Sequence, residues 1–102
     1  MGIPKNIQAK IAITLNRLLV LSQKLSPEER EKKQIASSYN KIAIQADIRK
    51  ATVSDTFNAK SVPELSTLIA IIEAMGFTLT DFSKIYDTIT ENEIKVFLST
   101  SE

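Results

Sequence analysis

Apolar residues recur along this chain at helical intervals, and the first such pattern covers residues 5–25. There the apolar positions lie three, four or seven residues apart, as on the buried stripe of one helix, and they are Ile7, Ile11, Leu15, Leu18 and Leu25. Ile13 and Val20 fall well away from this stripe, so they need another cover. A contact with a second copy or with the C-terminal tail is one option, and harmless exposure is the other.

Residues 26–36 form a charged connector. The stretch SPEEREKKQ opens with Ser-Pro, which starts a turn or a short solvated helix. Ser37 and Ser38 follow, and either hydroxyl can accept a hydrogen bond from the first free amides of a helix. The next apolar positions predict a second helix over residues 39–46, and they are Ile42, Ala43 and Ala46.

The third predicted helix, at about residues 50–58, contains few apolar residues. Val53 and Phe57, one turn apart, can dock inward with Thr56 beside them, and this turns four residues outward: Ala51, Ser54, Asp55 and Asn58. A helix needed only for a core presents three or four apolar residues in two turns. Its remaining face is therefore expected to contact something other than the core.

Residues 63–89 supply the predicted core and closing helices. Pro63 favours a helix start, and Gly76 is expected to end that helix in a left-handed conformation. The apolar residues between them cover so wide an arc that this fourth helix must be central to the core, and they are Leu65, Leu68, Ile69, Ile71, Ile72 and Met75.

Two capping boxes mark the last segments. Thr78 and Asp81 begin a fifth helix, whose apolar positions are Leu79, Phe82, Ile85, Tyr86 and Ile89. Thr90 and Glu93 form the second box, but the apolar residues after it alternate as in a strand, and they are Ile94, Val96 and Leu98. We predict an all-α, compact five-helix bundle over residues 1–89, with residues 90–102 a short helix or an edge strand suited to dimerisation.

The composition narrows the function. The chain has 102 residues with 43% hydrophobic and 25% charged side chains, as expected for one globular domain. Its longest apolar run, Leu68 to Ile72, is too short to span a bilayer, and its start lacks the features of a secretory signal. With neither Cys nor His, the chain lacks thiolate nucleophiles, the usual zinc ligands and the commonest general base. We expect a cytoplasmic protein that is not an enzyme, with no cofactor, no metal and no membrane partner.

The charges divide unevenly along the chain. Residues 1–60 hold eleven Lys and Arg against five Asp and Glu, whereas residues 61–102 hold two against seven. This polarity suits a body that turns one face toward a polyanion. Chance clustering of solvated charges is the alternative.

Two short helices joined by three or four residues are typical of the helix-turn-helix, in which the second helix lies along a DNA groove. From Ile42 to Phe82 the chain resembles, without a gap, the lambda-repressor-like (Cro/C1-type, XRE family) helix-turn-helix domain. The matching residues are Ile42, Ala43, Ile48, Thr52, Val53, Ser54, Pro63, Leu65, Leu68, Ile69, Ile71, Ala74, Met75, Gly76, Phe77, Thr78, Leu79 and Phe82.

Four features depart from the family pattern. Asp47 stands where Gly is usual in the turn, and Asp tolerates a left-handed backbone. Arg49 replaces the usual Ser cap of the recognition helix, and Ala59 replaces the Gly that commonly ends it. The charged connector is also longer than in most members of the family.

The resemblance implies that one group of side chains faces base edges in the major groove: Lys50, Ala51, Thr52 and Asp55. A second group would contact DNA phosphates: Tyr39, Asn40, Arg49, Asn58 and Lys60. Asp55 is repelled by phosphates, so it reads a cytosine amino group, pairs with a neighbouring Arg or Lys, or marks a helix that no longer binds DNA. Each of these residues is alternatively an ordinary solvated surface residue.

The resemblance therefore predicts a sequence-specific transcriptional regulator that binds double-stranded DNA, usually as a homodimer on two half-sites about one helical turn apart. The alternative is a protein-interaction module on the same fold, an antitoxin-like or anti-regulator subunit with a protein partner and weak or no DNA binding.

Overall fold

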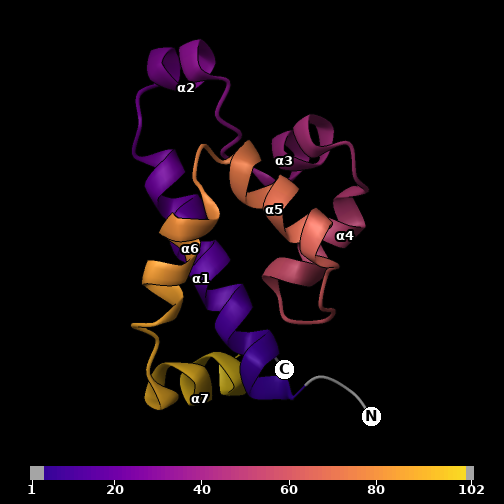
Figure 1. Ribbon diagram of the computed structural model, residues 1–102, viewed down its shortest axis with the longest axis vertical. Coiled ribbons are helices and arrows are strands. Elements are labelled where there is room, and N and C mark those ends of the chain that lie inside the picture. The colour runs from indigo at the N-terminus through magenta and orange to yellow at the C-terminus, as the bar shows by residue number, and fades with distance from the viewer. Residues whose placement is uncertain (1–3, 101–102) are drawn as a thin grey trace.

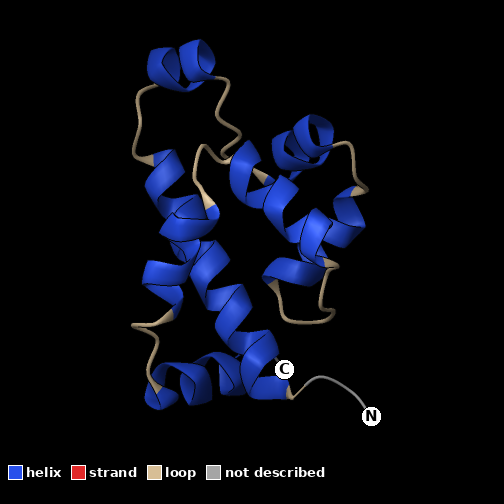
Figure 2. Cartoon of the chain, viewed as in Figure 1, coloured by secondary structure: helices blue, strands red, loops and turns tan. Residues whose placement is uncertain are grey.

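The computed structural model describes residues 4–100, and within this range the chain is all-α, with helices and no strand (Figures 1 and 2). The helices are α1 (Lys5–Gln23), α2 (Pro27–Lys33), α3 (Tyr39–Ala46), α4 (Lys50–Phe57), α5 (Leu65–Ala74), α6 (Leu79–Tyr86) and α7 (Glu91–Thr100). Residues 4–89 thus contain six helices rather than the predicted five, and the tail adds a seventh. Residues 1–3 of the predicted domain and residues 101–102 of the predicted tail lie outside the described part.

The two additional helices lie in the connector and in the tail. In α2, Pro27 is the first residue and the Ser26 hydroxyl accepts a hydrogen bond from the Glu29 amide at 3.2 Å, so the connector contains the short solvated helix that Ser-Pro allowed. In the tail, α7 replaces the edge strand, and that alternative was wrong. The first helix ends at Gln23 rather than residue 25.

The main core lies between α1, α3, α4, α5 and α6. Helix α1 packs against α4 and α6, and α5 packs against α3 and α6. In Figure 1, α3, α4 and α5 lie on one side of α1. The completely buried large side chains include Leu15, Leu18, Ile42, Val53, Phe57, Ile71 and Ile72.

A second, smaller cluster joins the lower part of α1 to α7 (Figure 1). Its buried members are Ala9 and Ile13 of α1, Ile89 of the preceding turn and Ile94 of α7. The tail of the same chain is therefore the missing cover of Ile13, while Val20 remains 49% exposed.

Three residues of the predicted apolar faces lie at the surface, and one of them is Leu79, which is 45% exposed at the start of α6. Ile7 is 42% exposed because the first turn of α1 extends past the main core, and Leu65 is 64% exposed because it opens α5 at the surface. Among residues 4–100, no single helix is long and apolar enough to cross a membrane; α5 and α6 pass that test only together, as a pair bent by 98°.

Helix α5 ends at Ala74, and Gly76, two residues further on, adopts the predicted left-handed conformation with φ +86°. A Cβ at this position would also lie 2.9 Å from Cγ1 of Ile35, so both the backbone and the close approach require glycine. The predicted capping box then starts α6: the Asp81 amide donates to the Thr78 hydroxyl at 3.2 Å, and the Thr78 amide donates to the Asp81 carboxylate at 2.9 Å.

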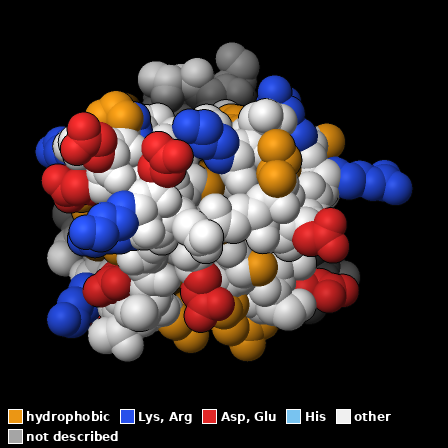
Figure 3. Space-filling view, turned by 90° about the horizontal axis from the view of Figure 1, so that it is seen from above, with side chains coloured by type: hydrophobic (Ala, Val, Ile, Leu, Met, Phe, Trp, Pro, Cys, Tyr) orange, Lys and Arg blue, Asp and Glu red, His pale blue; other side chains and the backbone are white. Residues whose placement is uncertain are grey.

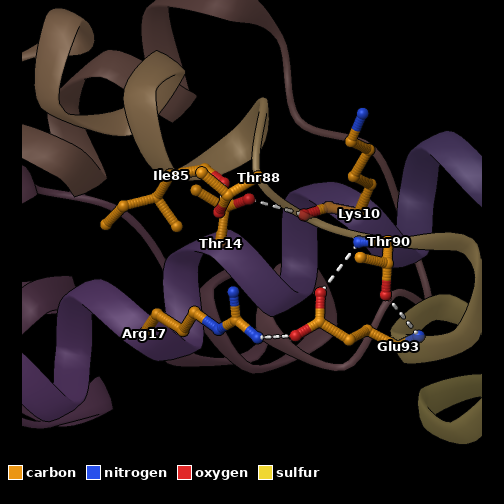
Figure 4. A network of polar contacts seen from close by, with 7 residues as sticks. All are labelled: Lys10, Thr14, Arg17, Ile85, Thr88, Thr90 and Glu93. Atoms are coloured by element: carbon orange, nitrogen blue, oxygen red, sulfur yellow. Dashed lines mark hydrogen bonds and ion pairs between the residues drawn. The ribbon is translucent and has the colours of Figure 1, made fainter.

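Helix α7 is held by a second confirmed capping box and by an ion pair (Figure 4). The Thr90 amide donates to the Glu93 carboxylate at 2.8 Å, the Glu93 amide donates to the Thr90 hydroxyl at 3.2 Å, and Arg17 of α1 pairs with Glu93. The Thr90 amide, followed by Arg17, lowers the pKa of Glu93. The same cap and the docking of Ile94 on α1 explain why the alternating residues form a helix.

Candidate functional site

The candidate site is built on α3 and α4, which pack against each other and are joined by the three residues from Asp47 to Arg49. Asp47 has φ +57°, so aspartate does occupy the left-handed conformation for which glycine was expected. The turn closes through the Ile48 amide, which donates to the Ala43 carbonyl at 3.0 Å. At the start of α3, Ser38 is the cap, since its hydroxyl accepts from the Lys41 amide at 3.2 Å, whereas Ser37 is buried.

Helix α4 is anchored by the side that was predicted. Val53 and Phe57 are completely buried and Thr56 is 1% exposed. The Thr56 hydroxyl donates back to the Thr52 carbonyl at 2.8 Å, which satisfies this polar group inside the core. The ring of Phe57 packs against Tyr39 of α3 with a centroid distance of 4.9 Å, so the two helices are also joined by an aromatic contact.

The remaining surface of α4 is exposed in its first turn and partly covered further along. Lys50 and Ala51, in the first turn, are exposed, and Thr52 and Asp55 are half-buried. The structure therefore brings together, on one short helix, all four residues that were predicted to face base edges. No other part of the described chain covers them completely.

The five predicted phosphate contacts divide into two kinds. Asn40, Arg49 and Lys60 are exposed at the ends of α3 and α4. The other two are held by neighbouring groups: Tyr39 is half-buried against Phe57, and the exposed amide of Asn58 donates to the Ser54 carbonyl at 2.8 Å. Burial raises the pKa of Tyr39, and a hydrogen bond with Asn58 offsets part of that increase. Both residues thus contribute to the contact between α3 and α4.

Both ends of α4 show the consequences of the sequence departures. Arg49 is the N-cap and makes no side-chain capping hydrogen bond, so the first amides of α4 lack a side-chain acceptor. At the other end, Ala59 has φ +58°, a left-handed conformation that costs a residue with a Cβ about 1–2 kcal/mol. The Lys60 amide then donates to the Asp55 carbonyl at 2.8 Å, and this closes the end of the helix.

The electrostatics of this region are mildly positive and mixed. Residues 39–60 carry four cationic side chains, those of Lys41, Arg49, Lys50 and Lys60, and two anionic ones, those of Asp47 and Asp55. Across residues 4–100 the only ion pair is between Arg17 and Glu93, so Asp55 has no Arg or Lys partner. Figure 3, which looks down on the end that carries α2, shows basic and acidic side chains interspersed there.

One residue that holds α4 was not found from the sequence. The side-chain amide of Asn16 on α1 donates to the Ala12 carbonyl at 2.8 Å and to the Phe57 carbonyl, in the last turn of α4, at 2.9 Å. Asn16 thereby ties the end of α4 to α1. Asn16 lies off the apolar stripe of α1, so the periodicity gave no signal for this contact.

Within residues 4–100, no group of three or more acidic side chains is placed to hold a metal ion. The chain matches no family model, no curated protein and no solved structure. The likeness to lambda-repressor-like domains is therefore carried by the residues quoted above.

Proposed function

We propose that this protein is a sequence-specific, DNA-binding transcriptional regulator of the Cro/C1 type, in which α3 and α4 act as a helix-turn-helix. One observation carries the proposal: α4 is lodged by the completely buried Val53 and Phe57, while Lys50 and Ala51 in its first turn stay exposed. A helix held along only one side can enter the major groove, which is about 12 Å wide, while the body stays outside.

The base contacts follow from the chemistry of the outward face. Lys50 can donate to guanine acceptors, Ala51 can contact a thymine methyl group, and Thr52 can donate or accept. Asp55 has no ion-pair partner in the described chain and can accept from a cytosine amino group. An Asp55 that reads cytosine would select against guanine and thymine, because its carboxylate would then face acceptor atoms and lack a donor.

The phosphate contacts fall mainly to the exposed cations. Arg49 and Lys60 lie at the two ends of α4 and Asn40 lies in the first turn of α3, so their side chains can reach the backbone on either side of the groove. Tyr39 and Asn58 have a smaller role at phosphates, since they are already engaged between α3 and α4.

Selection of bound duplexes from a random DNA pool tests the proposal. The wild-type chain is expected to enrich a defined site, and Lys50→Glu to lose it, because the new charge is repelled in the groove. Lys84→Glu is the matched control, since it makes the same charge change at an exposed residue of α6. Failure of the wild type to enrich any sequence, or an unchanged site in Lys50→Glu, would refute it.

The salt dependence of binding gives an independent check. The two cationic phosphate contacts, Arg49 and Lys60, predict a slope of log K against log salt of about −2 for each bound copy. Arg49→Ala should reduce that slope by about one while leaving the selected sequence unchanged. Binding that barely changes between low and moderate salt would contradict the phosphate contacts.

A protein-interaction module is the second candidate, and the unpaired carboxylate of Asp55 on the same helix as Lys50 favours it. A face that carries both signs of charge suits a protein surface better than a polyanion. In this case Asp55→Asn would weaken the complex with a co-purified protein partner, and no duplex would be enriched. Under the first candidate the same substitution relaxes the base preference at one position.

A further inference from the structure

The last turn of α4 is tied to α1 by one side chain, that of Asn16. An α-helix leaves its last four carbonyls without a donor inside the helix. Within residues 4–100, three of these carbonyls in α4 accept backbone amides of the residues just after the helix, and the fourth, that of Phe57, accepts the side-chain amide of Asn16 at 2.9 Å. Asn16 therefore completes the C-terminal cap of α4 from another helix. The three local pairs are Ser54 with Asn58, Asp55 with Lys60 and Thr56 with Ala59, at 3.0, 2.8 and 3.4 Å.

The side chain of Asn16 is itself held in place on α1. The same amide group also donates to the Ala12 carbonyl, one turn earlier on α1, at 2.8 Å. An amide NH₂ group has two hydrogens, so rotation of this side chain would lose both bonds. Helix α1 packs directly against α4. The donor that meets Phe57 thus has a fixed place on the neighbouring helix.

The bond to Phe57 acts in a direction that the apolar anchors of α4 do not control. The side chains of Val53 and Phe57 extend sideways from α4, and their burial is non-directional, so it selects the side that faces inward. Carbonyl groups at the end of a helix point along its axis. A hydrogen bond weakens steeply when its angle or distance changes. Asn16 therefore acts as a stop that fixes the position of α4 along its own axis.

The start of α4 has no comparable hold. Its N-cap, Arg49, makes no side-chain capping hydrogen bond, and Lys50 and Ala51 in the first turn are exposed. The helix has eight residues and is about 12 Å long, so a shift of its last turn along the axis also moves its first turn. The place of the first turn relative to the body is therefore decided at the other end of the helix.

We propose that Asn16 is a positioning residue for DNA recognition: through the Phe57 carbonyl it sets how far the first turn of α4 extends from the body. The inference rests on the proposed function, since it concerns how α4 reads bases. Contacts with base edges require hydrogen-bond geometry, whereas attraction to phosphates falls off gradually with distance. Loss of the Asn16 donor should therefore weaken binding to the selected duplex far more than binding to an unrelated duplex.

The affinities for these two duplexes test the proposal. Asn16→Leu keeps the approximate size of the side chain and removes the donor. It should weaken binding to the selected duplex at least about tenfold, as expected when a base contact is lost, and change binding to the unrelated duplex less than about twofold. Asn16→Asp keeps the shape and the polarity but cannot donate when ionised, so it should lower the ratio of the two affinities by a similar factor.

Ile94→Ala is the matched control. It removes buried apolar volume from the small cluster, which contains no residue of α4, and it should leave the ratio of the two affinities unchanged. A purely structural role of Asn16 would lower the fraction of folded protein and so weaken both complexes by the same factor. An equal loss for both duplexes, or an unchanged ratio in Asn16→Leu, would overturn the proposal.

NMR spectra of the free protein separate a failure of this proposal from a failure of the proposed function. Asn16→Leu should shift the amide resonances of Lys50 and Ala51, about two turns from the lost bond, and Ile94→Ala should not. A wild type that binds no duplex selectively refutes the DNA-binding function. Resonances of the first turn that stay in place in Asn16→Leu refute the positioning role, even where the wild type selects a duplex.

Discussion

The main core and the small α1–α7 cluster hold their helices in different ways. In the main core α4 is fixed by completely buried side chains, Val53 and Phe57, in contact with several other helices. At the other end, α7 rests on α1 through Ile94, a capping box and one half-exposed ion pair. Burial of large apolar groups is worth much more than an exposed ion pair. The difference indicates that α7 leaves the body before the main core unfolds.

The largest expected effect comes from truncation in the main core. Phe57→Ala should lower the free energy of unfolding by about 3–5 kcal/mol, because it opens a cavity beneath α4 and removes the contact with Tyr39. Urea denaturation followed by circular dichroism measures it. A loss below about 1 kcal/mol would mean that Phe57 does not anchor α4.

Truncation in the small cluster should have a smaller and more local effect. Ile94→Ala is expected to cost about 2 kcal/mol, at the low end for a buried Ile, because this edge cluster can collapse around the gap. Hydrogen exchange should show faster opening of amides in α7 and unchanged amides in α4. An equal increase of the exchange rates in both helices would show that the two clusters unfold as one unit, contrary to the difference proposed between them.

The left-handed backbone of Ala59, just after α4, predicts a substitution that stabilises the protein. Ala59→Gly should raise the free energy of unfolding by about 0.5 kcal/mol, since relief of the left-handed conformation exceeds the entropy that glycine adds to the unfolded chain. Thermal denaturation should show a higher midpoint. Asn58→Gly is the contrasting change: Asn58 has φ −105°, so glycine relieves no strain there and removes the hydrogen bond to Ser54, and the midpoint should fall. A lower midpoint for Ala59→Gly would show that its left-handed conformation is not strained.

The smallest expected effect is the response of α7 to acid. The pKa of Glu93 is lowered in the folded protein, so its contribution to stability is present above the ordinary value of 4.5 and is lost as the pH falls through the lowered value. Amide resonances of α7 should therefore shift below pH 4.5 before those of α4 do. Glu93→Gln should remove this early step. An early step that persists in that variant would assign it to another carboxylate.

Much of this fold could be predicted from local patterns. The two capping boxes, the left-handed Gly76 and the inward face of α4 all follow from side chains that act within one or two turns of each other. The same holds for Asp47, whose side-chain chemistry tolerates the turn. The side of α4 that points away from the core could also be predicted, because Val53 and Phe57 are the residues that dock inward.

The remaining features depend on residues far apart in the chain. Asn16 reaches a carbonyl 41 positions away, and Tyr39 and Asn58 are drawn together by the packing of α3 on α4. Leu65 fits the apolar arc of its helix, yet it lies where no neighbour covers it. Periodicity indicates which face of a helix is apolar, but it does not indicate how far along the helix the core extends.

The amino-acid sequence by itself thus determined where the capping boxes lie and which side of most helices is apolar, because caps and periodicity act over a few residues. Only the tertiary structure decided that the tail is a helix, that it covers Ile13, and that Val20 and Val96 stay exposed. These outcomes depend on which surfaces remain free once the main core has formed. That is a property of the assembled helices and not of any one segment.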